Sequence, residues 1–302
     1  MNIFKLNNLL FKFLNQDKKD AIKTDYGKAL IIASSYDYPF SGLISSKAAL
    51  LTGVGYLSFL VSDFNRDIYY NKAPIESTFI NVKSKDDSYL IDEKFEDILK
   101  YKSILFGNGM KVSKRNSLFL EKLIKEYQNN LIIDASGIRM LKDIDQNILK
   151  SHICNIIITP HILEFEYLLS LKHDGTRDSI IYLDKAKEYA RKYAIHVLLK
   201  SHDCLIVNKT KETYSNYSTT SLAKAGSGDF LSGLLLGFLA YNELVEVSVF
   251  DSIEMCDFLF HNSAKFLETK KLKRTITISD LEKTIRSYFD YLSKLSTSKV
   301  DK

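Results

Sequence analysis

A strand–helix–strand pattern near the N-terminus is the feature that most restricts the fold of this 302-residue chain. Residues 28–34 and 55–61 are short apolar runs, which are typical of buried strands. Between them, residues 42–52 carry alanines and leucines at helical spacing and stop at Gly53. Two strands joined by one helix in so short a stretch form a right-handed parallel βαβ unit. The pattern therefore predicts a parallel sheet.

Similar runs continue along the chain. Further strands are expected at residues 79–82, 103–106, 131–133, 155–158, 196–199 and 205–207. The last two are expected to pair and to continue toward Tyr214 as an antiparallel edge. Helices are expected at residues 116–127, 163–171, 183–193, 230–241, 245–267 and 278–295. In the first of these helices, the residues expected to face inward are Leu118, Leu120, Leu123 and Ile124. No internal repeat or linker interrupts the pattern, so we predict an α/β fold of three layers, with a mainly parallel sheet between helices.

We expect the chain to have two parts. Residues 1–24 form an N-terminal extension, and residues 25–302 form a single domain. The extension predicts an amphipathic helix, because its apolar residues share one broad face. These residues are Ile3, Phe4, Leu6, Leu10, Phe11 and Leu14. No small-residue cleavage site follows it, so we do not interpret it as a signal peptide.

Composition excludes several classes of partner. The net charge is +5, but lysines and acids are interspersed, which argues against a nucleic-acid-binding stripe. No stretch approaches the ~20 apolar residues of a membrane-spanning helix. The three cysteines, Cys154, Cys204 and Cys256, are far apart and show no metal-ligand spacing. Free thiols of this kind suit a reducing compartment, so we expect a cytoplasmic location.

Polar or glycine-containing clusters stand where several of the expected strands end. They are Ser34-Ser35, Gly107-Asn108-Gly109, Asp134, Thr159-Pro160-His161 and Lys200. Each cluster alone could be ordinary turn chemistry. In an open parallel sheet, however, the carboxyl ends of the strands line one crevice, which is where ligands bind. Their shared position favours a ligand site.

The stretch from Lys224 to Gly233 combines a small-residue loop, a carboxylate and the start of an apolar helix. Free N–H groups at a helix start attract an anion such as a phosphate. Asp229 would repel that anion unless it takes up a proton or meets a metal. The alternative is that Ser227 or Asp229 only caps the helix.

Together these motifs resemble the ADP/ATP-dependent NAD(P)H-hydrate dehydratase family, which has a ribokinase-like fold. The resemblance covers residues 25–281 and rests on several short segments. They are Asp25-Tyr26-Gly27-Lys28, residues 45–55, Gly107-Asn108-Gly109, Asp134-Ala135, Thr159-Pro160-His161 with Glu164, residues 225–233, and Phe260-His261. The segment 225–233 is similar to the family's Gly-Thr-Gly-Asp signature. The resemblance implies phosphorylation of a hydroxyl on a hydrated nicotinamide ring, followed by loss of phosphate, which restores NADH or NADPH.

The resemblance also implies roles for individual residues. Asp229 would be the catalytic base that takes the hydroxyl proton and touches the substrate. The other residues expected on the substrate side are Leu43, Gly107 and His161. Those expected to bind ADP or ATP are Lys200, Ser201, Cys204, Gly226, Ser227 and Gly228. Mg²⁺ is expected with the nucleotide phosphates, and no protein ligand cage for it is expected.

The chain departs from the family pattern at several of these positions. Ala33-Ser34-Ser35 stands where the first strand usually ends in Gly-Gly-Ser, and Lys200-Ser201 replaces Lys-Gly. Cys204 replaces a usual threonine, and Leu43 takes the place of a small residue. The Asp-Ala motif continues as Ser136-Gly137-Ile138-Arg139.

Two other functions are compatible with the same residues. One is a kinase of the same fold that acts on a vitamin-like alcohol. The other is a non-catalytic protein that only binds nucleotides. Glu164 is expected to cap its helix or to orient His161, and His261 to serve the core or an interface. The resemblance also implies a homo-oligomer, which the apolar late helices would allow.

Overall fold

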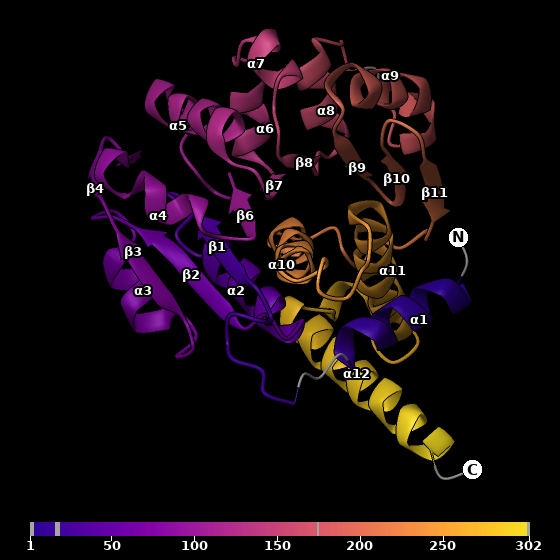
Figure 1. The fold of residues 1–302 in the computed structure, drawn as a ribbon. Helices are drawn as coiled ribbons and strands as arrows, with labels where there is room; N and C mark the ends of the chain where they lie inside the picture. Colours follow the sequence, from indigo (N-terminus) through magenta and orange to yellow (C-terminus); the bar gives the residue numbers. More distant parts are fainter. Residues whose placement is uncertain (1–2, 16–18, 174, 301–302) are drawn as a thin grey trace.

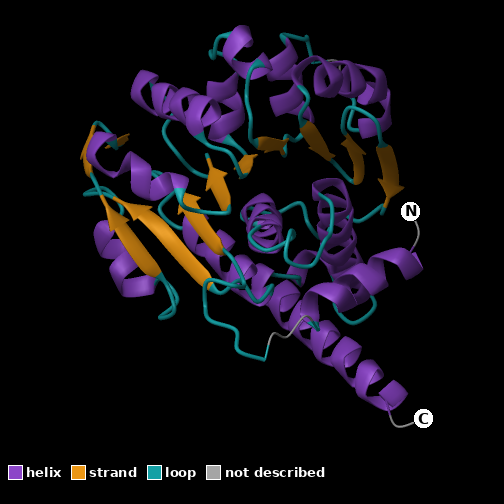
Figure 2. Ribbon diagram, viewed as in Figure 1, coloured by secondary structure: helices purple, strands orange, loops and turns teal. Residues whose placement is uncertain are grey.

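A nine-stranded sheet runs through the centre of the computed structural model, which describes residues 3–15, 19–173 and 175–300 (Figures 1 and 2). In spatial order its strands are β11 (Glu212–Asn216), β10 (Asp203–Val207), β9 (His196–Lys200), β8 (Asn155–Ile158), β7 (Asn130–Ile133), β6 (Ser103–Phe106), β1 (Lys28–Ile32), β2 (Tyr56–Val61) and β3 (Thr78–Asn81). Neighbouring strands from β9 to β3 are parallel, and β10 is antiparallel to both β9 and β11. The predicted mainly parallel sheet with an antiparallel edge is confirmed.

Helices cover both faces of the sheet (Figure 1). On one face lie α2 (Ser41–Leu51), α3 (Arg66–Lys72), α10 (Ser227–Leu239) and α11 (Val249–Glu268), with α1 (Ile3–Leu14) and α12 (Ile278–Val300) outside them. On the other lie α4 (Phe95–Leu99), α5 (Lys114–Glu126), α6 (Ser136–Leu141), α7 (Gln146–Lys150), α8 (Ile162–Leu169) and α9 (Leu183–Tyr193). A small hairpin of β4 (Lys83–Lys85) and β5 (Ser88–Leu90) adjoins this side. The three-layer αβα architecture is confirmed.

Strand β1 is apolar on both faces because helices cover both sides of the sheet. Ala29 and Ile31 belong to the core under α2 and α10, whereas Leu30 and Ile32 belong to the core under α4–α9. Successive side chains of a strand point to opposite faces, so a strand covered on both sides needs a continuous apolar run. The run at residues 28–34 therefore specifies a central strand.

The order of the strands reverses at β1. From there the chain builds β2 and β3 on one side, and then returns to build β6 through β11 on the other. The carboxyl ends of β1 and β6 consequently diverge into crossovers on opposite faces. This leaves a crevice at the switch point, which is the usual ligand position in such sheets.

Close packing between α2 and α10 fixes the start of α10 over that crevice. A Cβ atom on Gly233 would lie 2.2 Å from the carbonyl oxygen of Ser45, so only glycine permits this approach. The hydroxyl of Ser45 also donates to the carbonyl oxygen of Asp229, at 2.9 Å. Backbone contact between the two helices thus holds Asp229 in place.

Some expectations about the helices are wrong in detail. The buried residues of α1 are Leu6, Leu10 and Phe13, whereas Phe4 is 75% exposed and Ile3 and Phe11 are also exposed. Leu118 of α5 faces solvent, while Leu120, Leu123 and Ile124 are buried. The sequence also missed α3, α4, α6, α7 and the β4–β5 hairpin, because these elements are too short to show a clear period. Of the predicted extension, residues 1–2 and 16–18 lie outside the described residues.

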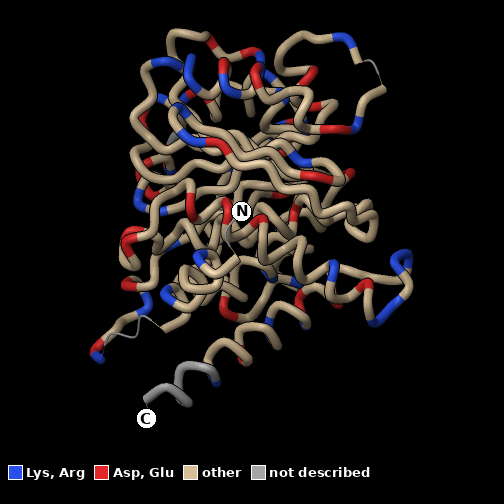
Figure 3. The backbone as a smooth tube through the Cα atoms, turned by 90° about the vertical axis from the view of Figure 1, so that its right-hand side faces the viewer, with Lys and Arg blue, Asp and Glu red and all other residues tan. Residues whose placement is uncertain are grey.

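Charged residues are scattered over the tube view rather than gathered in one stripe (Figure 3). Among the described helices, none combines the length and the apolar character required to span a membrane.

Candidate active site

Three of the strand-end clusters converge beside the start of α10. The ammonium of Lys200, at the end of β9, donates to Asp134 Oδ1 after β7 at 2.8 Å. Both side chains are largely buried. Burial lowers the pKa of Lys200, but the negative charges of Asp134, Glu164 and Asp229 outweigh this effect. The net result is a raised pKa. Lys200 is therefore a cation already paired with a carboxylate, and not a free point charge.

The start of α10 has the backbone form that an anion site needs. Gly226 is its N-cap, with φ of 88°, and no side chain caps the helix. The left-handed conformation favours glycine at this position. The interpretation of Ser227 or Asp229 as a simple helix cap is therefore wrong. A Cβ on Gly228 would lie 3.3 Å from the Lys200 ammonium, so this cation lies beside the helix start.

Asp229 lies in the first turn of α10, and its carboxylate is partly buried. Asn108 Nδ2 donates to Asp229 Oδ1 at 2.8 Å. Burial, together with the charge of Asp134, raises the Asp229 pKa to about 6, against the opposing effects of Lys200, Asn108 and Ser41. A carboxyl group with this pKa is mostly ionised at neutral pH but is a stronger base than an ordinary aspartate.

The turn after β6 places Asn108 with little freedom. Gly107 has φ of 120°, and a Cβ there would lie 2.2 Å from the carbonyl oxygen of Asp134. The Ser34 N–H donates to the carbonyl oxygen of Asn108 at 2.7 Å. Ser34 itself has φ of 75°, at a position where the resemblance led us to expect glycine. The Ser34 hydroxyl lies within hydrogen-bond distance of the carbonyl oxygen of Pro39, which accepts, and of the Tyr69 hydroxyl, and these contacts help to hold this strained conformation.

A cavity of about 480 Å³ adjoins the start of α10, where Ser227 and Gly228 line it. Five of the residues that line it were predicted from the sequence: His161, Lys200, Ser201, Ser227 and Gly228. Its volume falls within the usual range for small-molecule sites. The remaining wall comes from Arg177, His202, residues 219–220, residues 222–224, Leu231, Phe260 and His261.

His161 and Glu164 form a reciprocal cap at the start of α8. The Glu164 N–H donates to His161 Nδ1 at 3.3 Å, and the His161 N–H donates to Glu164 Oε2 at 3.0 Å. Glu164 Oε1 also lies 3.4 Å from His161 Nε2. Burial lowers the pKa of His161 despite the nearby Glu164. Glu164 therefore both caps the helix and orients His161, which were the two alternatives expected for it.

Five of the ten predicted site residues are not among the residues that line the cavity: Leu43, Gly107, Cys204, Gly226 and Asp229. Leu43 is 7% exposed and packs in the core between α2 and the sheet. Cys204 is fully buried, and its sulfur lies 3.7 Å from His261 Nε2. A nucleotide in the cavity would therefore meet His261 before it met Cys204.

Cys204, Asp257 and His261 form a buried cluster with the donor types of a metal site. The hydrogen bond of His261 Nδ1 is to the backbone carbonyl oxygen of Asp257, at 3.0 Å. Asp257 Oδ1 lies 3.0 Å from His261 Nδ1, and Cys204 faces Nε2 on the opposite side of the ring. Tyr217 stacks on His261 and donates to Asp257. The expected core role of His261 is confirmed.

Asn108, Asp134, Arg177 and Phe260 reach the site without a role having been predicted for them. Asn108 and Asp134 belonged to strand-end clusters, so their positions could be found from the sequence. Their partners could not, because Asn108 and Asp229 are 121 residues apart in the chain. Arg177 lies in an irregular segment that carries no periodic signal.

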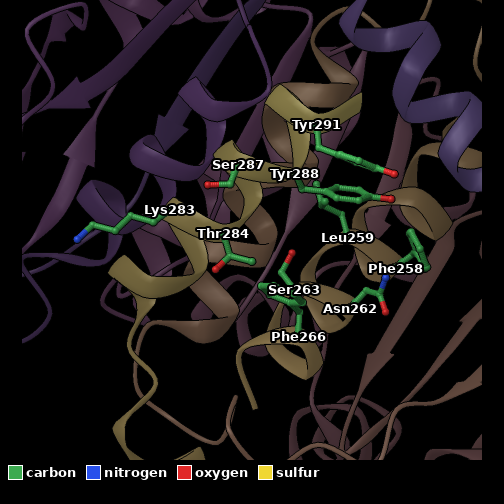
Figure 4. A pocket seen from close by; sticks show the side chains of 10 residues that line it. All are labelled: Phe258, Leu259, Asn262, Ser263, Phe266, Lys283, Thr284, Ser287, Tyr288 and Tyr291. Atoms are coloured by element: carbon green, nitrogen blue, oxygen red, sulfur yellow. The ribbon is translucent and has the colours of Figure 1, made fainter. Parts of the chain in front are cut away.

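A second cavity, of about 520 Å³, lies between α11 and α12 (Figure 4). Its wall is mostly apolar and includes Phe258, Leu259, Phe266, Tyr288 and Tyr291. It does not share a lining residue with the strand-end cavity.

Comparisons with known proteins agree with this geometry. The chain is 24% identical over 250 residues to the ADP-dependent (S)-NAD(P)H-hydrate dehydratase of Staphylococcus aureus, which covers 82% of this chain and 85% of that protein. It is 30% identical over 250 residues to the bifunctional NAD(P)H-hydrate repair enzyme of Helicobacter pylori, covering 79% of this chain but only 46% of that protein.

A solved structure shares the fold. It is the ADP/ATP-dependent NAD(P)H-hydrate dehydratase from Bacillus subtilis, co-crystallised with ATP and Mg²⁺, with a TM-score of 0.75 at 19% identity. The similarity covers 95% of this chain and 97% of that one. The family profile described as NAD(P)H-hydrate dehydratase matches residues 29–287. The chain therefore belongs to the NAD(P)H-hydrate dehydratase family.

Proposed function

We propose that this chain is a nucleotide-dependent dehydratase that restores NADH or NADPH from its hydrated form. The observation that carries the proposal is the partly buried carboxylate of Asp229, which lies in the first turn of α10 beside a nucleotide-sized cavity. Membership of the family supports the same reaction. The proposed substrates are hydrated NADH or NADPH and a nucleotide, which is either ADP or ATP.

In this reaction Asp229 takes the proton of the ring hydroxyl as its oxygen attacks the terminal phosphoryl group. Its pKa of about 6 suits a base that works at neutral pH. The N–H groups of Gly226 and Gly228 at the start of α10 face the charge that gathers on the transferred group. Phosphate then leaves one ring carbon while a proton leaves the adjacent ring carbon, and the double bond between the two carbons is restored.

The cavity supplies cations and hydrogen-bond donors for the nucleotide. Lys200, Arg177 and Lys224 line it, and His161 and Ser201 stand at its wall. Among the described lining residues there is no carboxylate to hold Mg²⁺. We therefore expect Mg²⁺ to enter with the nucleotide phosphates, whose charge it neutralises. Leu43 and Gly107 remain proposed contacts of the substrate. Cys204 remains a proposed residue of the nucleotide site, and it would act there through His261, which it contacts.

The deciding experiment incubates the purified protein with hydrated NADH and either ADP or ATP, and follows the return of NADH absorbance. The proposal predicts recovery with at least one nucleotide. No recovery with either nucleotide, for hydrated NADH and hydrated NADPH alike, would sink it. Running the two nucleotides side by side also identifies the phosphoryl donor.

Asp229→Asn separates the dehydratase from a protein that only binds nucleotides. The variant keeps the shape of the side chain but cannot take up a proton. We expect turnover to fall by about 10²–10⁴-fold while nucleotide affinity is kept. Turnover that survives the substitution would show that the base is elsewhere. A kinase of vitamin-like alcohols would instead phosphorylate a hydroxymethylpyrimidine or a thiazole alcohol and leave hydrated NADH unchanged.

We further propose a cytoplasmic location and a homo-oligomer. Cys154, Cys204 and Cys256 are free and buried, as suits a reducing compartment. The apolar groove between α11 and α12 would support self-association (Figure 4). Light scattering during gel filtration measures the mass directly, and a mass near 34.6 kDa would contradict the oligomer.

A further inference from the structure

Asn108 occupies a fully buried position between α2 and α10. Its Nδ2 atom lies 2.8 Å from Asp229 Oδ1, 2.8 Å from Ser232 Oγ and 3.4 Å from Ser45 Oγ. All three are oxygens. The amide therefore meets the carboxylate from inside the protein, on the side away from the nucleotide cavity.

The two serines fix which way round this amide stands. Ser232 donates its proton to the carbonyl oxygen of Gly228 or Asp229, at 3.0 and 3.1 Å. Ser45 donates to the carbonyl oxygen of Asp229 at 2.9 Å. With their protons committed, both hydroxyl oxygens can only accept from Asn108. A reversed amide would bring its oxygen against these lone pairs and against the carboxylate.

The carbonyl oxygen of the same amide has no such contact within the described parts of the chain. Asn108 Oδ1 is buried and has no hydrogen-bond partner among the described residues. An unpaired buried acceptor is costly, and a leucine of similar size would avoid that cost. A residue that only shaped the turn would not need an amide here. The donor side of the amide, which faces Asp229, supplies the reason for an asparagine.

We propose that Asn108 is a positioning residue that holds Oδ1 of the ionised Asp229 and so orients the carboxylate to take the substrate proton. The inference rests on the proposed role of Asp229 as the base. A donor that meets the ionised carboxylate stabilises it relative to the protonated form. Asn108 thus both aims the base and limits how far burial raises its pKa.

Other charged groups act on Asp229 from the elements packed around it. Asp134 after β7 raises the pKa of Asp229, and Lys200 at the end of β9 lowers it. From α3, the buried phenol of Tyr69 is itself affected by the charge of Asp229. In α11, Asp257 and His261 pair with each other. A test of Asn108 must therefore leave these groups unchanged.

Asn108→Leu tests the proposal through the pH dependence of turnover. The substitution removes the donor and keeps roughly the same volume. We expect the acidic limb of kcat/KM to move up by about one pH unit, as loss of a hydrogen bond to a charged group implies. The plateau should also fall, mainly through kcat, because the base is no longer aimed. A limb that stays in place would overturn the inference.

Asn130→Leu is the matched control. Asn130 is also a buried asparagine that contacts α10, but its Nδ2 donates at the far end of the helix, to the carbonyl oxygen of Leu239 at 2.8 Å. Its loss should lower stability without moving the acidic limb. An equal shift in both variants would mean that a general loosening of α10 is responsible, and would overturn the specific role of Asn108.

The free energy of unfolding, measured at a series of pH values, reports the pKa of the same carboxyl group and does not require turnover. Because the folded pKa of Asp229 lies above its unfolded value, its contribution to stability is present at pH 4 and is lost as pH rises through about 6. Asn108→Leu should extend this loss to higher pH by about one unit. In an Asp229→Asn background it should make no such difference.

This double comparison separates the two proposals. If no variant and no wild-type protein converts hydrated NADH, the proposed function fails, yet the unfolding series still shows whether Asn108 sets the pKa of Asp229. If turnover is found and Asn108→Leu alters neither the limb nor the unfolding series, the function stands and the positioning role falls.

Discussion

The ammonium of Lys200 and the carboxylate of Asp134 form a 2.8 Å ion pair that joins the ends of β9 and β7. The pair stands beside the start of α10 and acts on Asp229 with opposite signs: Asp134 raises its pKa and Lys200 lowers it. The pKa of Asp229, which burial raises, is therefore adjusted by residues at the ends of two strands that are not neighbours in the sheet. This arrangement leads to four predictions.

Asp134→Asn should change two properties at once. Removing the negative charge lowers the pKa of Asp229, so the acidic limb of turnover should move to lower pH. Lys200 is left buried without its partner, which should cost about 3 kcal/mol of stability at neutral pH. Urea unfolding and a pH–rate profile measure the two effects. A variant with wild-type stability would show that the pair is not formed in solution.

The wild-type enzyme should lose activity in acid with a half-point near pH 6. Asp229 must be ionised to act as a base, and burial raises its pKa to about 6. Below that value kcat/KM should fall about tenfold per pH unit. A profile of kcat/KM from pH 4.5 to about 8.5 checks this. A half-point near 4, the ordinary range of an aspartate, would contradict the effect of burial.

Lys200→Ala and Cys204→Ala should differ in their effect on nucleotide binding. Lys200 lines the cavity and can meet a phosphate, so its loss should weaken ADP or ATP binding by about tenfold or more. Cys204 is fully buried behind His261, so its loss should change affinity by less than about threefold. Calorimetric titration with each nucleotide measures both. Equal weakening would place the thiol in direct contact with the ligand.

Gly233→Ala should destabilise the protein and lower turnover together. The new Cβ would lie 2.2 Å from the carbonyl oxygen of Ser45, so α10 must move away from α2. Overpacking of this kind costs roughly 1–3 kcal/mol. The shift carries Asp229 with it, so kcat should fall. Thermal melting and steady-state kinetics test both.

Gly175→Ala is the control for that substitution. A Cβ at Gly175 has nothing within 4 Å, although its φ of 89° adds backbone strain. It should cost some stability and leave kcat unchanged. If kcat also fell in the control, the loss of turnover in Gly233→Ala could not be assigned to a shift of α10, and the prediction would fail.

The residues of the site differ in how far the sequence could reveal them. The loop at residues 226–228 and Asp229 could be found from local pattern, because glycine conformation and helix starts depend on near neighbours. Asn108 and Asp134 could be placed at strand ends for the same reason. The burial of Cys204 and Leu43 could not, because it depends on which helix covers their strand or face.

The sequence by itself determined the order along the chain of the strands of the central sheet and of the longer helices, the three layers and the crevice at the carboxyl ends of the strands. It did so because alternation and helical spacing are properties of residues two to four apart. Only the tertiary structure decided that Lys200 is paired with Asp134 and that Asn108 holds Asp229. Those contacts join residues 66 and 121 positions apart, and they form only once the parallel sheet brings its strand ends together.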